Sequence, residues 1–108
     1  MDDDIQLLIR RLIAGDAAAR ARLQLLARTA RAPTVLVAAA LVSHDSDELL
    51  ARAAATATTT RDRQLVAITA AHLAHDEDLL DALVRDHLAD HPDSILAAWI
   101  ATQHQRPA

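Results

Sequence analysis

The histidines are the residues of this chain best suited to metal chemistry. Six are present, and four of them form two spaced pairs, His72 with His75 and His87 with His91. On a helix, spacings of three and four place two imidazoles on one face, as a pair of zinc ligands requires. If the pairs lie on antiparallel helices joined beside His75, the second pair is roughly 15–20 Å further along. That is too far for one metal site, so we predict no metal and no cofactor.

Each histidine also has a simpler structural interpretation. His44 and His75 fall at predicted helix C-termini, where the negative end of the helix dipole favours a cation. His87 and His91 are expected to pack, partly buried, beside apolar neighbours on their own helix. A pH-sensitive interface built from these two is the alternative.

Hydrolase and calcium chemistry have weaker support. The run Ser43-His44-Asp45 contains the residue types of a catalytic triad, but adjacent side chains point in different directions and a triad is assembled in space. The acidic runs at 45–48 and 76–78 lack the glycine and the ligand spacing of a calcium loop. Such runs suit the first turns of helices, where the dipole favours anions. We therefore predict that the protein is not an enzyme.

The composition argues against several functional classes. The 108 residues carry a net charge of −4, and all 11 cations are scattered arginines, which is not the footprint of a nucleic-acid binder. The absence of cysteine excludes disulfides and thiol chemistry. The segment MDDDIQLLIRRL is too acidic for a signal peptide, and no apolar run approaches a membrane span. We predict a cytoplasmic protein that binds neither nucleic acid nor membranes.

Helix-forming residues dominate the chain. Many Ala and Leu residues, a single glycine and no Phe or Tyr favour an all-α fold, and the length suits one domain, 1–108. The predicted helices run from about 2 to 14, 17 to 30, 34 to 43, 46 to 58, 61 to 74, 77 to 90 and 93 to 104.

Capping signals mark the boundaries of these helices. Gly15-Asp16 combines a C-terminal glycine with the next N-cap, and Pro33 suits a helix start. Asp45, with Glu48 three residues later, resembles a capping box. The threonine run 58–60 can cap the helix that follows it.

Three of the breaks have the same form. Each of them, at residues 14–16, 43–45 and 74–76, follows one predicted helix and opens another, and their aspartates are 29 and 31 residues apart. A period near thirty residues with two helices per period is typical of an α-solenoid. The predicted hairpins cover about 2–30, 33–58 and 61–91, and a terminal helix at about 93–104 caps the stack.

The third hairpin carries a family resemblance. Its signature residues are Arg61-Asp62-Arg63 at the start of the first helix, Asp76 at the turn, and His87-Leu88 with His91-Pro92 at the end of the second. Over about residues 61–98 the chain resembles the tetratricopeptide-repeat family, closest to its tetratricopeptide-38-like bacterial branch. The likeness is faint over 33–58.

The chain departs from the family pattern at several positions. His44 and His75 stand where the family has glycine, Leu80 replaces a small residue, and the aromatic residues of the family consensus are missing. A compact helical bundle is therefore the alternative to an open superhelix.

The resemblance implies that the first helix of each hairpin lines a concave, largely apolar groove. The candidate partner-binding residues mapped onto it by turn position are Ile9, Leu12, Leu41, Leu65, Thr69 and His72. Arg61, with His72, is expected to supply polar specificity at one end of the groove. A contiguous apolar patch on a protein surface usually marks an interface. The alternative is that the helices close on each other and bury this face.

The leading hypothesis is a non-catalytic protein-interaction module that binds a peptide, a helix or its own copy through the apolar first-helix face. The second is a homodimeric structural or regulatory assembly subunit, because a core with so few bulky side chains gains from self-association. The third is a histidine-based metal-binding protein.

Overall fold

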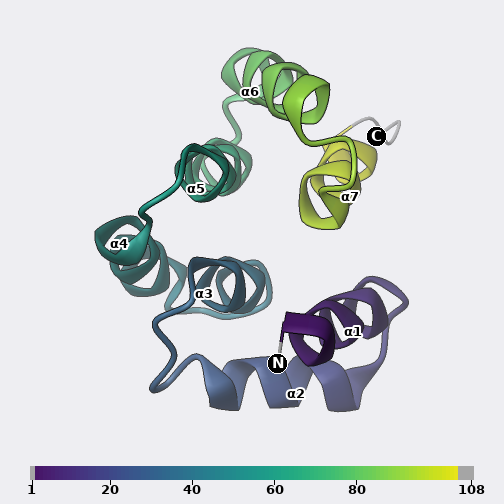
Figure 1. Ribbon diagram of the computed structural model, residues 1–108, viewed down its shortest axis with the longest axis vertical. Helices are drawn as coiled ribbons and strands as arrows, with labels where there is room; N and C mark the ends of the chain where they lie inside the picture. Colours follow the sequence, from purple (N-terminus) through teal and green to yellow (C-terminus); the bar gives the residue numbers. More distant parts are fainter. Residues whose placement is uncertain (1, 105–108) are drawn as a thin grey trace. The chain divides into compact units, whose positions relative to one another are not determined.

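The computed structural model describes residues 2–104, and these residues form seven helices and no strand (Figure 1). The helices are α1 (Asp2–Ile13), α2 (Ala17–Leu26), α3 (Pro33–Ala40), α4 (Ser46–Thr56), α5 (Thr60–Leu73), α6 (Glu77–Asp90) and α7 (Ile95–His104). The all-α prediction is confirmed. None of the helices in this range combines the length and apolar character that crossing a membrane requires.

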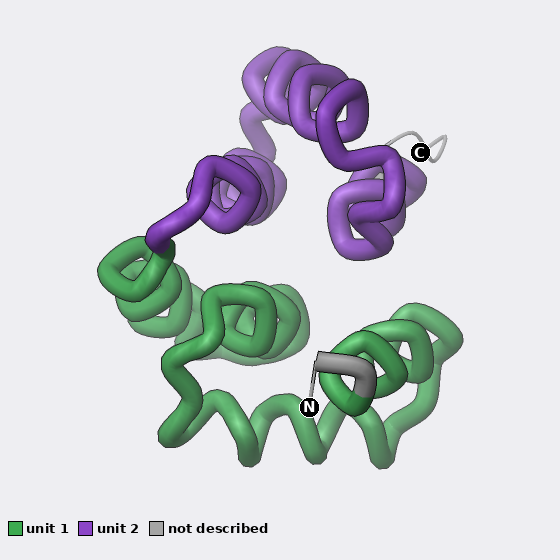
Figure 2. The backbone as a smooth tube through the Cα atoms, in the orientation of Figure 1, with its two compact units in different colours: residues 1–57 green, residues 58–108 purple. Residues whose placement is uncertain are grey.

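The chain divides into two compact units (Figure 2). Unit 1 comprises Met1–Ala57 and contains α1 to α4, whereas unit 2 comprises Thr58–Ala108 and contains α5 to α7. The division falls in the threonine run that precedes α5. Thr59 is the N-cap of α5, and its hydroxyl accepts a hydrogen bond from the Asp62 amide at 3.1 Å.

In unit 1, each helix packs against the next one along the chain. The short helix α3 contacts both α2 and α4, and its six residues from Val35 to Ala40 are all buried. An apolar helix without a polar face can be stabilised only where neighbours cover it on most sides. Pro33 occupies the first helical turn as expected.

In unit 2, α5 and α6 pack against each other and α7 packs against both. Aliphatic side chains from the three helices form its buried interior: Leu65, Ile68, Leu80, Val84, Leu96 and Ile100. The connection between α6 and α7 contains Pro92, which lacks the amide hydrogen needed to continue a helix.

The turn between α1 and α2 is closed by Gly15. Its φ of 92° lies in the left-handed region, where glycine has no steric penalty. The Asp16 amide donates to the Arg11 carbonyl at 2.9 Å, the 6→1 bond of a Schellman motif. The Asp16 carboxylate then caps α2 by accepting from the Ala18 amide at 2.9 Å, as predicted.

The turn between α5 and α6 repeats this geometry with a histidine in the glycine position. His75 has φ 59°, and the Asp76 amide donates to the Ala71 carbonyl at 3.0 Å. The Asp76 carboxylate caps α6 by accepting from the Leu79 amide at 3.3 Å. Two of the three predicted equivalent breaks are therefore the same structure.

The third break, between α3 and α4, is different. Helix α3 ends at Ala40, and none of the residues 41–45 that follow it has a positive φ. This turn therefore lacks the left-handed residue of the other two. The Val42 carbonyl instead accepts hydrogen bonds from Gln24 Nε2 at 2.8 Å and Arg20 Nη2 at 3.3 Å. Side chains of α2 thus satisfy a carbonyl at the end of α3, the role that a Schellman bond has in the other two turns.

The predicted capping box at Asp45 is wrong. Asp45 occupies the N-cap position of α4, but its side chain makes no capping hydrogen bond. Its ψ of 39° departs from the extended conformation that directs an N-cap side chain toward the amides of the first turn.

Two other helices are shorter than predicted. The segment expected to be helical at 17–30 ends at Leu26, and the next helix ends at Ala40 rather than near 43. After Leu26, the Arg28 and Thr29 amides bond three residues back rather than four, so the chain tightens into a turn.

His75 supplies a test of this turn geometry. A non-glycine residue in the left-handed conformation costs about 1–2 kcal/mol, partly offset in a glycine variant by the greater freedom of its unfolded chain. We expect His75→Gly to stabilise unit 2 by about 1 kcal/mol. Trp99, the only aromatic residue of the Phe, Tyr and Trp class, lies on α7, so urea unfolding followed by its fluorescence reports on this unit.

The matched control is Gly15→Ala in unit 1. A Cβ at Gly15 meets no atom within 4 Å, so this substitution adds no steric clash. The change in stability, followed by far-ultraviolet circular dichroism because Trp99 lies in unit 2, reports the left-handed strain less the gain from a stiffer unfolded chain. An unchanged or lower midpoint for His75→Gly, with Gly15→Ala destabilising as expected, contradicts the strain argument.

Candidate functional site

Four of the seven predicted partner-binding residues are buried. Ile9 and Thr69 have no exposed surface, and Leu12 and Leu65 retain 6% and 5%. The Thr69 hydroxyl donates to the Leu65 carbonyl at 2.9 Å, a bond within α5. These side chains lie in the interior, and their contact with a partner stays a prediction.

The other three predicted residues keep exposed surface. Arg61, in the first turn of α5, is exposed and lies 3.6 Å from the Asp93 carboxylate. Leu41 follows α3 and His72 lies near the end of α5, and both are half-buried. Leu41 belongs to unit 1, and Arg61 and His72 belong to unit 2.

Unit 1 contains a pocket formed by α2, the α3–α4 connection and α4. Its volume is about 520 Å³, which is within the range of sites that bind small molecules or peptide side chains. We call it the α2–α4 pocket, and its lining residues are Gln24, Ala27, Arg28, Ser43, His44, Asp45, Glu48, Leu49 and Arg52.

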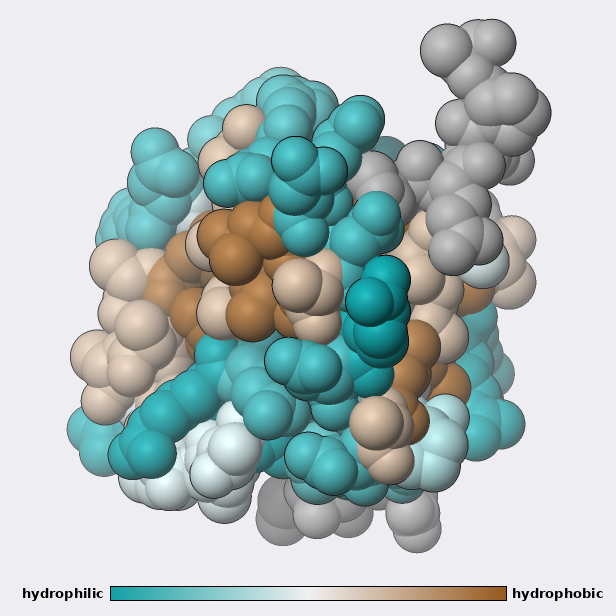
Figure 3. Space-filling view, turned by 90° about the horizontal axis from the view of Figure 1, so that it is seen from above, coloured by the Kyte–Doolittle hydropathy of each residue, from teal (hydrophilic) through white to brown (hydrophobic). Residues whose placement is uncertain are grey.

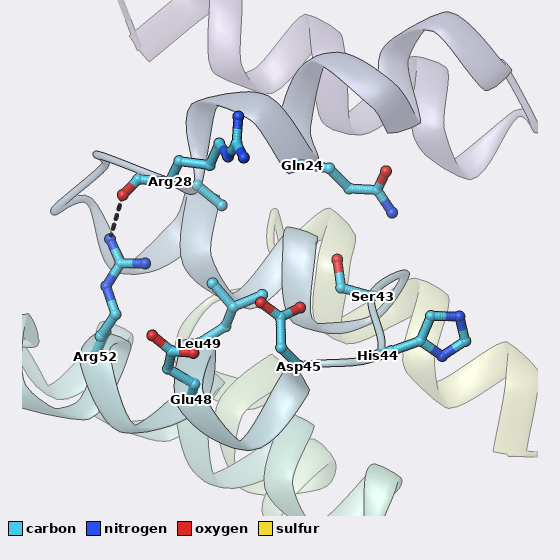
Figure 4. Close-up of a pocket in the computed structure, with 9 residues that line it drawn as sticks. Gln24, Arg28, Ser43, His44, Asp45, Glu48, Leu49 and Arg52 are labelled. Carbon is cyan, nitrogen blue, oxygen red and sulfur yellow. Dashed lines mark hydrogen bonds between the residues drawn. The ribbon is translucent and has the colours of Figure 1, made fainter.

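Polar and apolar groups are arranged around this pocket in a definite way. Figure 4 shows the Ser43 hydroxyl, the Asp45 carboxylate and the Leu49 side chain directed into the space between α2 and α4. The ring of His44 points away from that space. Leu49 and Ala27 are buried and provide the apolar part of the lining.

Hydrogen bonds hold the walls of the pocket in place. Arg52 Nη2, on α4, donates to the Ala30 carbonyl at 3.0 Å and more weakly to the Arg28 carbonyl at 3.5 Å. The bond from Gln24 to the Val42 carbonyl joins α2 to the connection that precedes α4. The three walls are thus tied together by side chains that reach backbone carbonyls beyond their own helices.

Four charged side chains line the pocket without pairing with one another. Asp45 and Glu48 come from the start of α4, and Arg28 and Arg52 come from α2 and α4 or the residues just beyond them. Within residues 2–104, neither acid forms an ion pair with either arginine. The pocket therefore presents charges of both signs to a ligand.

The sequence motifs for catalysis and metal binding do not assemble a centre here. Ser43 and Asp45 both line the α2–α4 pocket, but in the described chain no hydrogen bond joins the side chains of Ser43, His44 and Asp45. Across the part of the chain that the structure describes, no group of three His, Cys, Asp or Glu side chains is placed to hold a metal ion.

Unit 2 contains a buried polar network centred on His87. The imidazole has no exposed surface, and its two nitrogens are 2.8 Å from Gln64 Oε1 and 3.0 Å from Ser94 Oγ. Because the Gln64 oxygen can only accept, Nδ1 carries the proton and Nε2 accepts from the Ser94 hydroxyl. The neutral imidazole thus joins α5, α6 and the residue that precedes α7.

Burial lowers the pKa of His87 below its ordinary value of 6.5, because the protonated ring loses its hydration. The charges of His91 and Arg61 act in the same direction, and those of Asp90 and Asp93 oppose it. The ring of His91, the residue just after α6, has its centroid 5.1 Å from that of His87. The sequence-based expectation of partial burial underestimated how completely His87 is enclosed.

Sequence reasoning identified neither the α2–α4 pocket nor the partners of His87. Gln64 lies 23 residues before His87 and Ser94 lies seven after it, so no helical periodicity connects the three. The one available signal is Pro92, which ends α6 and forces a turn that can bring Ser94 back toward the helix.

The chain matches no protein-family model, no curated protein and no solved structure.

The Arg52 hydrogen bonds supply a test of how the pocket is built. Replacing Arg52 by Met keeps much of the apolar stem and removes the donor that reaches the Ala30 and Arg28 carbonyls. We expect a loss of about 1 kcal/mol in unfolding free energy, the usual net worth of such bonds. Urea unfolding followed by far-ultraviolet circular dichroism measures it.

Arg22→Met is the matched control. Arg22 is exposed on α2, and its replacement should change the unfolding free energy by less than about 0.5 kcal/mol. Equal effects of the two substitutions would show that the Arg52 bonds do not hold the pocket walls.

Proposed function

We propose that this chain is a non-catalytic protein-interaction module whose α2–α4 pocket takes a short polar peptide segment carrying both an acidic and a basic side chain. The single observation behind this proposal is a pocket lined by Asp45, Glu48, Arg28 and Arg52 whose charges are not paired with each other. Arg52 already donates to the Ala30 and Arg28 carbonyls, so Arg28, Asp45 and Glu48 are the groups that can form charge-assisted hydrogen bonds with a ligand of complementary pattern.

A peptide suits the pocket better than an apolar small molecule does. Side chains of both charge signs, a hydroxyl from Ser43 and an amide from Gln24 surround a small apolar part provided by Leu49 and Ala27. Apolar ligands are normally held by mainly hydrophobic walls with few polar groups. Alternating acidic and basic side chains on an extended peptide match the mixed lining.

The proposal includes a tetratricopeptide-like repeat as the architecture. Its support is the shared geometry of the turns at Gly15 and His75, each with a left-handed residue and a 6→1 hydrogen bond. In this proposal Leu41, Arg61 and His72 remain secondary partner contacts because they keep exposed surface. The buried first-helix residues support the helices that carry the partner-binding surface.

Selection from a displayed library of random heptapeptides tests the proposal directly. The full chain serves as bait, and peptides that also bind a chain with Arg28→Gln, Asp45→Asn and Glu48→Gln are removed by counter-selection. We expect enriched peptides with an acidic and a basic residue close together. In fluorescence titrations of the best peptide, Glu48→Gln should weaken binding about fivefold, corresponding to about 1 kcal/mol for a partly exposed ion pair.

Asp47→Asn is the matched control. Asp47 and Glu48 both lie in the first turn of α4 and both are exposed, but only Glu48 lines the pocket. The two substitutions remove similar favourable interactions with the helix dipole, so a difference between them isolates the pocket. Failure to enrich any peptide, or equal binding to the Glu48 and Asp47 variants, contradicts the proposal.

A homodimeric assembly subunit is the second candidate. Three large apolar side chains are about half exposed: Leu7 at 48%, Leu25 at 54% and Leu79 at 48%. Figure 3 shows one face of the chain on which hydrophobic side chains gather between hydrophilic ones. An interface between two copies of the chain would bury exposed apolar surface of this kind.

Light scattering at several concentrations distinguishes the two functions. The peptide-binding module is expected to remain a monomer up to tens of micromolar, roughly the range in which weak self-association appears. A dimer that dissociates in a Leu7→Gln, Leu25→Gln or Leu79→Gln variant would favour the second candidate.

A further inference from the structure

We propose that His87 couples the docking of α7 to pH, so that protonation of its imidazole favours a state in which α7 is detached from α5 and α6. This property is independent of the α2–α4 pocket, since every residue that it involves lies in unit 2. It rests on the position of one buried imidazole at the junction of three segments.

The hydrogen bonds of His87 hold the start of α7. Ser94, the residue before α7, is 5% exposed, and its hydroxyl donates to His87 Nε2. The Ser94 carbonyl also accepts from the Ala98 amide at 3.1 Å, which begins the hydrogen bonding of α7. The His87–Ser94 bond therefore ties the first turn of α7 to α6, while Gln64 fixes the ring from α5.

A protonated ring is disfavoured in this arrangement. Nε2 would become a donor, so the Ser94 hydroxyl would have to turn its own hydrogen aside and accept from the ring instead. A positive charge would also enter a site with no exposed surface, where its lost hydration is not replaced by a paired anion.

The charged groups around His87 do not compensate that charge. Asp90, at the end of α6, favours protonation, and Arg61 on α5 disfavours it. In the connection after α6, His91 disfavours protonation and Asp93 favours it. Asp93 is itself paired with Arg61 at 3.6 Å. The residues of α7 from 95 to 103 contain no charged side chain. Together with burial, these charges lower the pKa of His87.

Detachment of α7 exposes the imidazole to water, so the protonated ring regains its hydration. In the detached state His87 takes up a proton near its ordinary pKa of 6.5, whereas in the docked state its pKa is lower. The docked state is therefore favoured fully above pH 6.5 and progressively less as the pH falls below it. Between about pH 7.5 and about pH 5.5 the detached fraction rises by up to about tenfold, the limit reached when the docked ring stays neutral.

Detachment would also uncover apolar side chains. Leu96, Ala97 and Ile100 on α7 are at most 2% exposed when it is docked. The segment that leaves is thus a largely apolar helix of this chain, and the surface that it leaves belongs to α5 and α6. The apolar surfaces that a partner can reach are therefore different in the acid-favoured state and in the docked state.

Amide hydrogen–deuterium exchange of the full chain tests the coupling. Exchange is measured by mass spectrometry at about pH 7.5 and about pH 5.5 and corrected for the intrinsic pH dependence, so that it reports the opening of each helix. We expect the protection of α7 to fall by up to about tenfold on acidification, with α5 and α6 less affected. Helices α1 to α4 of unit 1 serve as the internal reference.

Substitutions of the two neighbouring histidines separate His87 from other titrating groups. His87→Gln removes the titration and should abolish the pH dependence of α7 protection. His91→Gln, four residues further along the chain, leaves the His87 network in place and should retain the pH dependence. Ser94→Ala should lower α7 protection at both pH values because the bond to His87 is lost.

Four results would overturn the proposal. They are protection of α7 that does not change with pH, pH dependence that persists in His87→Gln, its loss in His91→Gln, and an equal fall in α5, α6 and α7, which would mean that unit 2 opens as a whole. Should His87→Gln fail to fold, nuclear magnetic resonance titration of the His87 ring in the unmodified chain decides. A pKa at or above 6.5 rejects the coupling, and a lower pKa accompanied by pH-dependent exchange in α7 supports it.

Discussion

Satisfying the backbone groups at helix ends is the constraint on which this structure depends. The described helices are between 8 and 14 residues long, so end groups make up a large share of their backbone. The chain meets this need in several ways: left-handed residues at Gly15 and His75, side-chain caps at Asp16, Thr59 and Asp76, and bonds from other helices to exposed carbonyls. Among the described residues, no buried side-chain nitrogen or oxygen lacks a hydrogen-bond partner.

The two candidate functional regions arise from this constraint. In unit 1, Gln24 and Arg52 bond the carbonyls of Val42 and Ala30, in the segments that follow α3 and α2, and these bonds hold the walls of the α2–α4 pocket. In unit 2, the start of α7 is bonded through Ser94 to a buried imidazole. Short helices therefore place polar side chains at their junctions, which are the places where a ligand or a proton can act.

The sequence predicted the helices well, because local signals determine where they begin. Asp16, Pro33 and Thr59 act at helix starts as expected, and α6 has the predicted range of 77–90. The ends of α2 and α3 were predicted too late, since Ala- and Leu-rich segments carry no local stop signal. Those ends depend on contacts from elsewhere, such as the bonds of Gln24 and Arg20 to the Val42 carbonyl.

The sequence by itself determined the all-α class, the number of helices and the breaks between them, because propensity and capping act over a few neighbouring residues. Only the tertiary structure decided which polar groups meet. The pocket combines residues from α2, the α3–α4 connection and α4, and the His87 network joins residues 23 and seven positions away. It also decided that Ile9 and Thr69 are interior, since the exposure of a residue on an apolar helix face depends on which neighbours cover it.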